Sequence, residues 1–442
     1  MWSAFALLAA LVAPAGSTGD AVVPTPWPSP ATEAAERRAL PAPLSSVFPS
    51  ADFPGPVIGA PSGLSPGLHV YGWLEPGIEL STSHASNYPL SYQDVPNALE
   101  LDQAVLRVER EPDTVQTRHG DWGVRLTAFY GNDYRFTTAE GYLSDQLLLR
   151  NQVYGFDPLE MYGILYFPRW GEGTIVQVGR YISPPDIEAQ LAPSNFLYSH
   201  SLMFTFDGFT QTGVMAATRL SPWWTVLYGI HAGDDMAPWD PSAHIPTIEL
   251  FGRWVSHANK DSVLFGIDAL NDGRVKTYRI GSDLFGHDDL QQDNVTWTHV
   301  FTPELQNEFE AYWLYSFGAY QGGTINDGPF RLGAGGGPGI FLPGRSTAVG
   351  AVDYLEKALG PKDYLSLRLD WLNDPRGWRT GFATSYGSVT LGLSHAFSSG
   401  VLLRPEVRTE RAFAPGVTPY DDGTRAYQTT VGADAIIWFG SH

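Results

Sequence analysis

The stretch LSLRLDW (residues 365–371) places Leu or Trp at every second position, with Ser, Arg and Asp between them. Successive side chains of a β-strand point to opposite faces, so this alternation predicts a strand with one apolar and one charged face. Residues 304–317 and 400–411 repeat the pattern with several charges on one face. Because lone charges are costly against lipid, we assign the charged faces to a wet interior.

Strand-like segments of this kind fill the chain from about residue 68 to the C-terminus. We place sixteen of them, at 68–82, 97–111, 119–132, 156–168, 173–182, 208–219, 222–233, 246–257, 261–271, 291–302, 304–317, 345–359, 362–373, 385–397, 400–411 and 426–439. The number is even, as a single-chain bacterial barrel requires.

The connections between these segments alternate between short and long. The short ones have turn chemistry and lie at 169–172, 221, 258–260, 302–303, 360–361 and 398–399, with a somewhat longer one at 112–118. The long ones are 83–96, 133–155, 183–207, 234–245, 272–290, 318–344, 374–384 and 412–425. An up-and-down transmembrane β-barrel has tight periplasmic turns and longer outer loops. The sequence therefore predicts an all-β antiparallel barrel with both termini on the periplasmic side.

A soluble antiparallel sandwich with one wet face would show the same alternation. Aromatic residues at the segment ends favour the membrane barrel, whose interfaces carry aromatic girdles. Those near the short turns are Phe167, Trp170, Trp223, Trp224, Phe301, Phe397 and Phe439, and those near the long loops are Tyr130, Tyr181, Trp313, Phe317 and Trp371. A β-propeller is disfavoured because no repeat of about forty residues is found.

The first 66 residues do not continue the strand pattern. Residues 2–14 are apolar and precede the small residues Ala15, Gly16 and Ser17, which predicts a signal peptide at 1–19, although a basic n-region is missing. Residues 20–66 are rich in Pro, Ala and Ser, and we interpret them as a disordered linker that offers contact with cell-wall material. The barrel then occupies 67–439, and 440–442 form a short tail.

Composition excludes several classes of protein. The 442 residues hold 27 Lys and Arg against 47 Asp and Glu, and the net charge of -20 makes nucleic acid an unfavourable partner. No stretch after the N-terminus has the roughly twenty apolar residues of a spanning helix. No Cys is present, so disulfides and thiolate metal sites are excluded.

Motifs that resemble catalytic or cofactor sites have simpler explanations. The GLSPG sequence at 63–67 matches a nucleophile elbow but lies in the linker with no strand before it. The Gly-rich run at 333–339 lacks the Lys and Ser or Thr of a phosphate loop. His231, His299 and His395 stand singly in strands, and the 11 His show no metal-ligand spacing. We expect no catalytic residue, cofactor or metal, and leave calcium at the acidic pairs 234–235, 288–289 and 421–422 as an alternative.

The charged faces of the strands are the candidate site. Expected to line the interior are Arg107, Arg125, Arg180, Arg253, Arg368, Arg404, Arg408, Glu308, Glu310, Asp370, Glu406 and Glu410. Opposed charges in a narrow aqueous pore sort solutes by charge, whereas salt-bridge ladders only brace the wall, and both roles remain open. Loop 183–207 combines Asp186 and Glu188 with apolar residues, which are unusual in a loop exposed to water. We therefore favour a loop that folds into the lumen and forms the constriction, with an external cap as the alternative.

Several motifs resemble the OmpL-like β-barrel porin family of Gram-negative outer membranes. They are QVGRY (177–181), PSNF (193–196), YS (198–199), FTQTGV (209–214), LDQA (101–104), FYGND (129–133), LRPEVR (403–408) and TVGAD (430–434). The resemblance implies an outer-membrane pore and no catalytic residues. One departure is that Phe439 is followed by Gly440, Ser441 and His442, whereas such barrels commonly end on the aromatic residue.

The resulting hypothesis is a porin that passes small hydrophilic solutes by diffusion through a charged lumen, with outer-membrane lipid around it. A homotrimer is compatible with such a barrel. Two alternatives are a structural or adhesive barrel with a plugged lumen and, less favoured, a barrel enzyme acting on lipid. No Ser, His and acid grouping at a lipid-facing edge can be recognised for the enzyme.

Overall fold

The structure, a computed structural model, describes residues 67–440 except 275–289, 323–340 and short gaps at 90–91, 94, 115, 149, 151, 241–242, 244, 320, 361 and 399. The predicted signal peptide, the predicted linker, the Gly-rich run and the acidic pair at 288–289 lie outside the described residues. Across the described part of the chain, no helix combines the length and the apolar character needed to cross a membrane.

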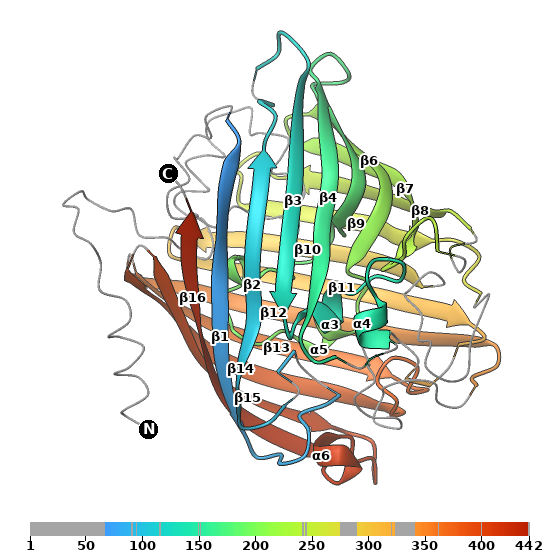
Figure 1. The fold of residues 1–442 in the computed structure, drawn as a ribbon, viewed down its shortest axis with the longest axis vertical. Coiled ribbons are helices and arrows are strands. Elements are labelled where there is room, and N and C mark those ends of the chain that lie inside the picture. The colour runs from blue at the N-terminus through green and yellow to red at the C-terminus, as the bar shows by residue number, and fades with distance from the viewer. Residues whose placement is uncertain are drawn as a thin grey trace.

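Sixteen strands form one closed antiparallel barrel (Figure 1). They are β1 (His69–Ser81), β2 (Ala98–Arg110), β3 (Asp121–Gly131), β4 (Gly155–Phe167), β5 (Thr174–Ile182), β6 (Thr210–Ser221), β7 (Trp224–Asp234), β8 (Thr247–Val255), β9 (Asp261–Leu270), β10 (Gln291–Thr302), β11 (Leu305–Phe317), β12 (Arg345–Gly360), β13 (Asp363–Asp374), β14 (Thr384–Ser398), β15 (Val401–Ala412) and β16 (Tyr427–Gly440). The predicted strands are confirmed in number and order.

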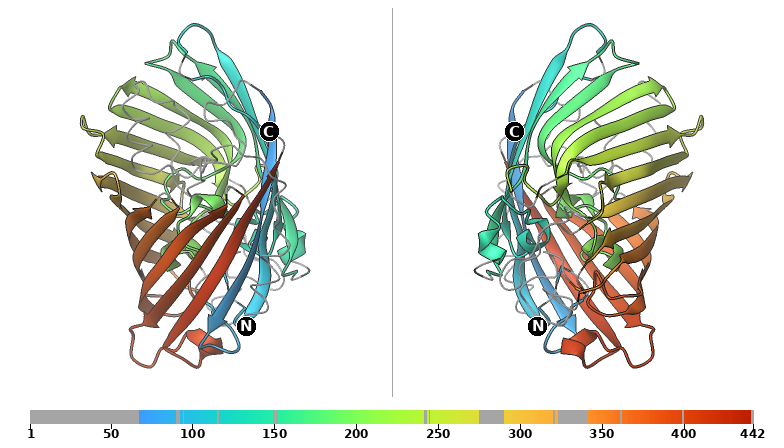
Figure 2. Two further views of the ribbon diagram at one scale, coloured as in Figure 1. Left: turned by 90° about the vertical axis from the view of Figure 1, so that its left-hand side faces the viewer. Right: turned by 90° about the vertical axis from the view of Figure 1, so that its right-hand side faces the viewer.

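Each strand pairs with its neighbours in sequence, and β1 closes the wall by pairing with β16 from Tyr71–Gly440 to Ser81–Thr430. Closure removes the free edges that an open sheet would expose. Figure 2 shows the strands tilted along the wall, as closure into a barrel requires. The fold class expected from the sequence is therefore confirmed.

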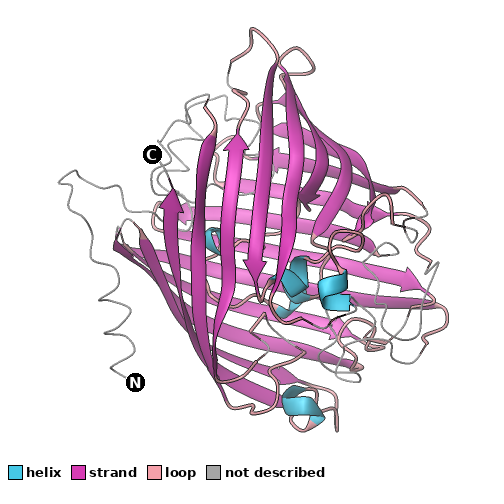
Figure 3. Ribbon diagram, viewed as in Figure 1, coloured by secondary structure: helices cyan, strands magenta, loops and turns pink. Residues whose placement is uncertain are grey.

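Short turns and long loops gather at opposite ends of the barrel. The β2–β3 turn and α6 (Tyr420–Gly423), in a long connection, mark the two ends in Figure 1. The long connections contain helical turns that the strand pattern does not predict, coloured cyan in Figure 3. These include α3 (Tyr134–Thr137), α4 (Asp145–Leu148), the 3-10 turn η2 (Ala192–Ser194) and α5 (Leu202–Thr205).

The two faces of the wall differ as the alternation predicts. In β13, Leu365, Leu369 and Trp371 are exposed on the outside, while Arg368 and Asp370 are buried on the inside. The outward aromatic residues at the strand ends include Trp170, Trp224, Phe301, Phe397 and Phe439 at the short turns and Tyr130, Trp313, Phe317 and Trp371 near the long loops. An apolar band flanked by aromatic rings suits a lipid-facing wall.

Tyr181 is a correction to the predicted girdle. Its ring is buried in a cluster with inward residues of β4 to β9, and its hydroxyl donates to Oε1 of Glu249 at 2.9 Å. The reason is register: Tyr181 pairs with Gln211, whose side chain points inward to Asp268. Proximity to a long loop does not by itself tell which face a side chain occupies.

Candidate functional site

The connection between β5 and β6 folds into the barrel. Every residue from 183 to 209 is buried except Ile187, which is half-buried. The segment contacts strand residues that point inward, and α5 lies within the outline of the barrel (Figure 1). We call residues 183–209 the lumen loop.

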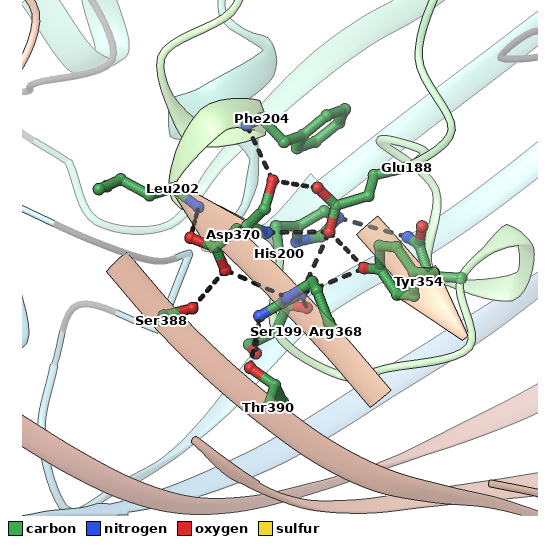
Figure 4. A network of polar contacts seen from close by, with 12 residues as sticks. Glu188, Ser199, His200, Leu202, Phe204, Tyr354, Arg368, Asp370, Ser388 and Thr390 are labelled. Carbon is green, nitrogen blue, oxygen red and sulfur yellow. Dashed lines mark hydrogen bonds and ion pairs between the residues drawn. The ribbon is translucent and has the colours of Figure 1, made fainter. Parts of the chain in front are cut away.

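Arg368 on β13 joins the lumen loop to the wall (Figure 4). Its Nη1 lies 3.1 Å from Oε1 of Glu188 and donates to the carbonyl of Ser199, and its Nη2 donates to Oγ of Ser199 at 3.0 Å. From β12, the hydroxyl of Tyr354 donates to the same Glu188 oxygen at 2.6 Å. Asp370 accepts from Ser388 and from the amide of Leu202 at 3.4 Å. Loop and wall thus form one polar network.

Residues of β15 continue this attachment toward the end of the chain. Nη1 of Arg404 donates to the carbonyls of Ala192 at 2.8 Å and Asn195 at 2.9 Å. Glu406 accepts from the amides of Tyr198 at 2.9 Å and Ser199 at 3.1 Å. A third contact runs from Nη1 of Arg408 to the carbonyl of His200, at 2.6 Å. Charge-assisted hydrogen bonds of this kind hold the loop backbone at a fixed distance from the wall.

Wall glycines leave room for the loop side chains. A Cβ at Gly392 would lie 2.4 Å from Cδ2 of Leu197, and one at Gly77 would lie 2.2 Å from the hydroxyl of Tyr198. The same hydroxyl donates to Oδ2 of Asp102 on β2 at 2.9 Å. The lumen loop therefore packs directly on the strands from β11 round to β2.

The other predicted interior residues fall into separate groups. Arg107 and Arg125 pair with Glu160 and Glu109 on the inner face of β2 to β4. Glu308 accepts from Gln306 at 3.2 Å on β11. Arg180 pairs with Asp157 at 2.6 Å and donates to the carbonyl of Thr137, beside the loop that carries α3. Arg253 is half-buried on β8.

Acidic residues outside the arginine ion pairs gather where the lumen loop meets β7 to β11, with Arg379 near Asp207. Asp186 and Asp207, near the two ends of the loop, meet Glu310 of β11, with one oxygen from each within 4.8 Å of the others. Asp234, Glu249 and Asp268 lie nearby on β7 to β9 and are buried. None of these six carboxyls forms an ion pair with another described residue.

Burial changes the protonation of three groups in the lumen loop. It raises the pKa of Asp207 to about 6, and it raises the pKa of Asp186, which the charges of Asp207 and Glu310 raise further. It lowers the pKa of His200 to about 3, and three nearby arginines act in the same direction. Low dielectric disfavours the charged form in each case. His200 is therefore neutral at physiological pH.

Sequence reasoning named the arginines and part of the acidic set as interior residues but missed several of the residues that contact them. No chemical motif marks the loop residues Tyr198, Ser199 and Asp207 as partners of the wall. Tyr354 looks like an ordinary aromatic residue of a strand. The alternation gives no clear signal for Tyr354, because its neighbours on the opposite face are the charged Asp353 and the apolar Leu355. No pattern in the sequence shows which loop residue would meet it.

Comparison with known proteins identifies the family. A family model described as "Putative beta-barrel porin-2, OmpL-like" matches residues 67–439. The chain belongs to this family. Its members are porins of the outer membrane, and the closed barrel described above agrees with that membership. No curated protein matches the chain.

Solved porin structures resemble the barrel at low sequence identity. An anion-selective porin from Comamonas acidovorans has a TM-score of 0.51 at 11% identity, covering 84% of this chain and 99% of that one. The channel DcaP of Acinetobacter baumannii has a TM-score of 0.49 at 10% identity, with coverage of 84% and 97%. OmpT of Vibrio cholerae, in its trimer form, has a TM-score of 0.49 at 11% identity, with 84% and 99%. The likeness to the first supports the fold alone.

Proposed function

We propose that this porin passes small hydrophilic solutes by passive diffusion through an interior narrowed by the lumen loop, without covalent chemistry. The observation that carries the proposal is the attachment of the loop backbone to Arg368, Arg404 and Arg408 inside a closed barrel. A barrel of sixteen strands is wide enough for an aqueous channel. A loop held across such an interior sets the size of the passage.

The charges of the interior favour cations. Arg368, Arg404 and Arg408 each lie beside a carboxylate, so their charges are compensated. Among the described residues, no ion pair is formed by Asp234, Glu249, Asp268 or Glu310. Those of these acids that ionise beside a water-filled passage would raise the local cation concentration. We expect a preference for potassium over chloride.

Planar-bilayer recording tests both statements. The purified protein should give discrete single-channel steps, and a potassium chloride gradient should give a reversal potential of the sign expected for cations. Arg404→Glu should move the reversal potential further toward cation selectivity, because it replaces a positive charge by a negative one. An unchanged reversal potential would remove Arg404 from the set of selectivity residues.

The plugged structural or adhesive barrel is the second candidate, and the near-complete burial of the lumen loop favours it. The plugged barrel predicts that a planar bilayer shows no channel conductance after the folded protein is inserted. Deletion of residues 189–199, with a Gly-Ser bridge, separates the candidates. If the protein is a porin, the deletion enlarges single-channel conductance steps that are already present. If the barrel is plugged, the deletion creates conductance steps where the wild type has none.

Association between copies is a further part of the proposal. Asp353 on β12 points outward between Tyr354 and Val352, which point inward, and it accepts from Nδ2 of Asn307 at 2.7 Å. An acid on a lipid-facing wall is unfavourable unless it is covered. A homotrimer that buries this position would remove the cost. Light scattering of the detergent-solubilised protein should then give three copies, and Asp353→Lys should reduce that number.

Export and surface location complete the proposal. Removal of residues 1–19 as a signal peptide would deliver the chain to the outer membrane, and the segment 20–66 would extend from the periplasmic end toward the cell wall. Amino-terminal sequencing of the mature protein tests the first statement. Co-sedimentation with peptidoglycan, with and without residues 20–66, tests the second.

A further inference from the structure

Three buried carboxyls converge where the two ends of the lumen loop meet the wall. Asp186 lies near the beginning of the loop, Asp207 near its end, and Glu310 on the inner face of β11, with one oxygen of each within 4.8 Å of the others. Asp207 is fully buried, and the other two are nearly so. Three carboxyls this close cannot all be ionised without a counter-charge.

The carboxyl oxygens keep free capacity for a ligand. The three carboxyls contact one another, and Oδ1 of Asp186 and Oδ2 of Asp207 accept no hydrogen bond from a donor outside the cluster. Each oxygen of Glu310 accepts one hydrogen bond, from the amide of Ile187 at 2.8 Å and from Nδ2 of Asn294 at 3.1 Å. A carboxylate oxygen that accepts one hydrogen bond can still coordinate a cation.

An independent observation comes from two amides on β10. Gln292 is almost completely buried, and neither its side-chain nitrogen nor its oxygen has a hydrogen-bond partner, although it lies beside the carboxyl of Asp207. Asn294, two residues further on the same inner face, donates to Glu310 but leaves its own Oδ1 without a partner. Buried amides are normally satisfied, so the unpartnered side chain of Gln292 beside Asp207, with the unpartnered Oδ1 of Asn294 on the same face, points to a cation that would bind at the cluster.

The donor set selects the kind of ion. Three carboxylates and two amide oxygens, with no His or Cys, suit a hard divalent cation. Calcium accepts six to eight oxygens in irregular geometry, whereas magnesium demands octahedral geometry and retains several waters. A site this buried leaves little room for those waters, so calcium is favoured over magnesium.

We propose that Asp186, Asp207 and Glu310, together with the amide oxygens of Gln292 and Asn294, form a calcium site that ties both ends of the lumen loop to β11. The sequence gives no hint of such a site, because its residues are spread over 125 positions, from 186 to 310. The ion would neutralise charge at the base of the loop and fix the loop in the interior. Calcium would therefore stabilise the narrowed state of the barrel.

Terbium luminescence tests the site on the folded protein in detergent, freed of lipopolysaccharide and treated with a chelator. Buried Tyr312, close to Asp207 and Glu310, can sensitise terbium emission. Calcium should displace the terbium, with magnesium at least tenfold weaker. Asp207→Asn and Glu310→Gln should each weaken terbium binding by about tenfold or more. Asp268→Asn, which removes a neighbouring buried acid outside the site, should leave binding within about twofold.

The proposal is overturned if terbium fails to bind saturably, if magnesium competes as well as calcium, or if Asp268→Asn weakens binding as much as Asp207→Asn. Heat-dependent migration on SDS gels verifies that each variant is folded before it is titrated. The binding experiment needs no conducting channel. A bilayer without conductance would therefore refute the porin function but not the calcium site. Absence of terbium binding would refute the calcium site but not the porin function.

Discussion

Nη2 of Arg404 on β15 lies 2.9 Å from Oε1 of Glu75 on β1, although 329 positions separate the two residues in the chain. Between them, Asp434 of β16 accepts from Nε of Arg404 at 3.0 Å. The same guanidinium holds the carbonyls of Ala192 and Asn195. One side chain thus joins the first strand, the last two strands and the lumen loop across the seam where the barrel closes.

Replacing this guanidinium should weaken the seam. Arg404→Gln leaves the buried carboxylates of Glu75 and Asp434 without a counter-charge, which costs about 3–5 kcal/mol when a buried pair is broken. The temperature at which the folded band disappears on SDS gels should fall. Arg425→Gln is the matched control, because the Arg425–Asp421 pair is more exposed and such pairs contribute about 0–1 kcal/mol. Equal shifts for the two variants would contradict the role of Arg404.

A side chain at Gly392 should displace the lumen loop. Gly392→Leu places atoms in the space of Leu197, and overpacking of this kind costs about 1–3 kcal/mol. We expect lower heat stability and greater open-channel noise in bilayer recordings. Gly163→Leu provides the control, since nothing lies closer than 4.0 Å to a Cβ there. If Gly392→Leu leaves both the open-channel noise and the heat stability unchanged, the loop does not pack on β14 as described.

Acid should destabilise the lumen loop through His200. Its ring stacks against both Tyr92 and Phe204 and lies 2.9 Å from the carbonyl of Ala189. The pKa of His200 in the folded chain is about 3, below its ordinary value of about 6.5. Between these two pH values the unfolded chain binds a proton at His200 and the folded chain does not. Stability conferred by neutral His200 is therefore complete above about pH 6.5 and falls by about 1.4 kcal/mol per pH unit below it.

The comparison that isolates this effect is wild type against His200→Gln. Gln keeps a hydrogen-bond donor but does not titrate in this range. The advantage of wild type in heat stability should shrink between pH 6.5 and pH 4.5. A constant difference across that range would mean that His200 becomes protonated without cost.

The outer wall should tolerate charge at its ends but not at its middle. Leu369→Arg places a cation on the exposed face of β13, where a charge near the bilayer midplane costs about 2–4 kcal/mol. Leu359→Arg, beside the short turn after β12, should cost about 0–1 kcal/mol. Refolding into lipid vesicles over a urea series measures both. Equal costs would argue against lipid around this wall.

The alternation at 365–371 and its repeats predicted the fold because side-chain period and turn chemistry are local properties of the chain. Strand number, loop lengths and the inward direction of Arg368, Arg404 and Glu310 follow from them. The helical turns α3 and α5 escaped prediction, since each is only one turn long and is held by contacts with distant strands.

The sequence by itself determined that a wall with an apolar outside and a charged inside would form, since a period of two needs no information beyond neighbouring residues. Only the tertiary structure decided that Tyr181 turns inward, that Arg404 meets Glu75, and that Asp186, Asp207 and Glu310 converge. These contacts depend on the register of the strands around a closed barrel and on the path of one loop through its interior. Closure couples all sixteen strands at once, and no local pattern records that constraint.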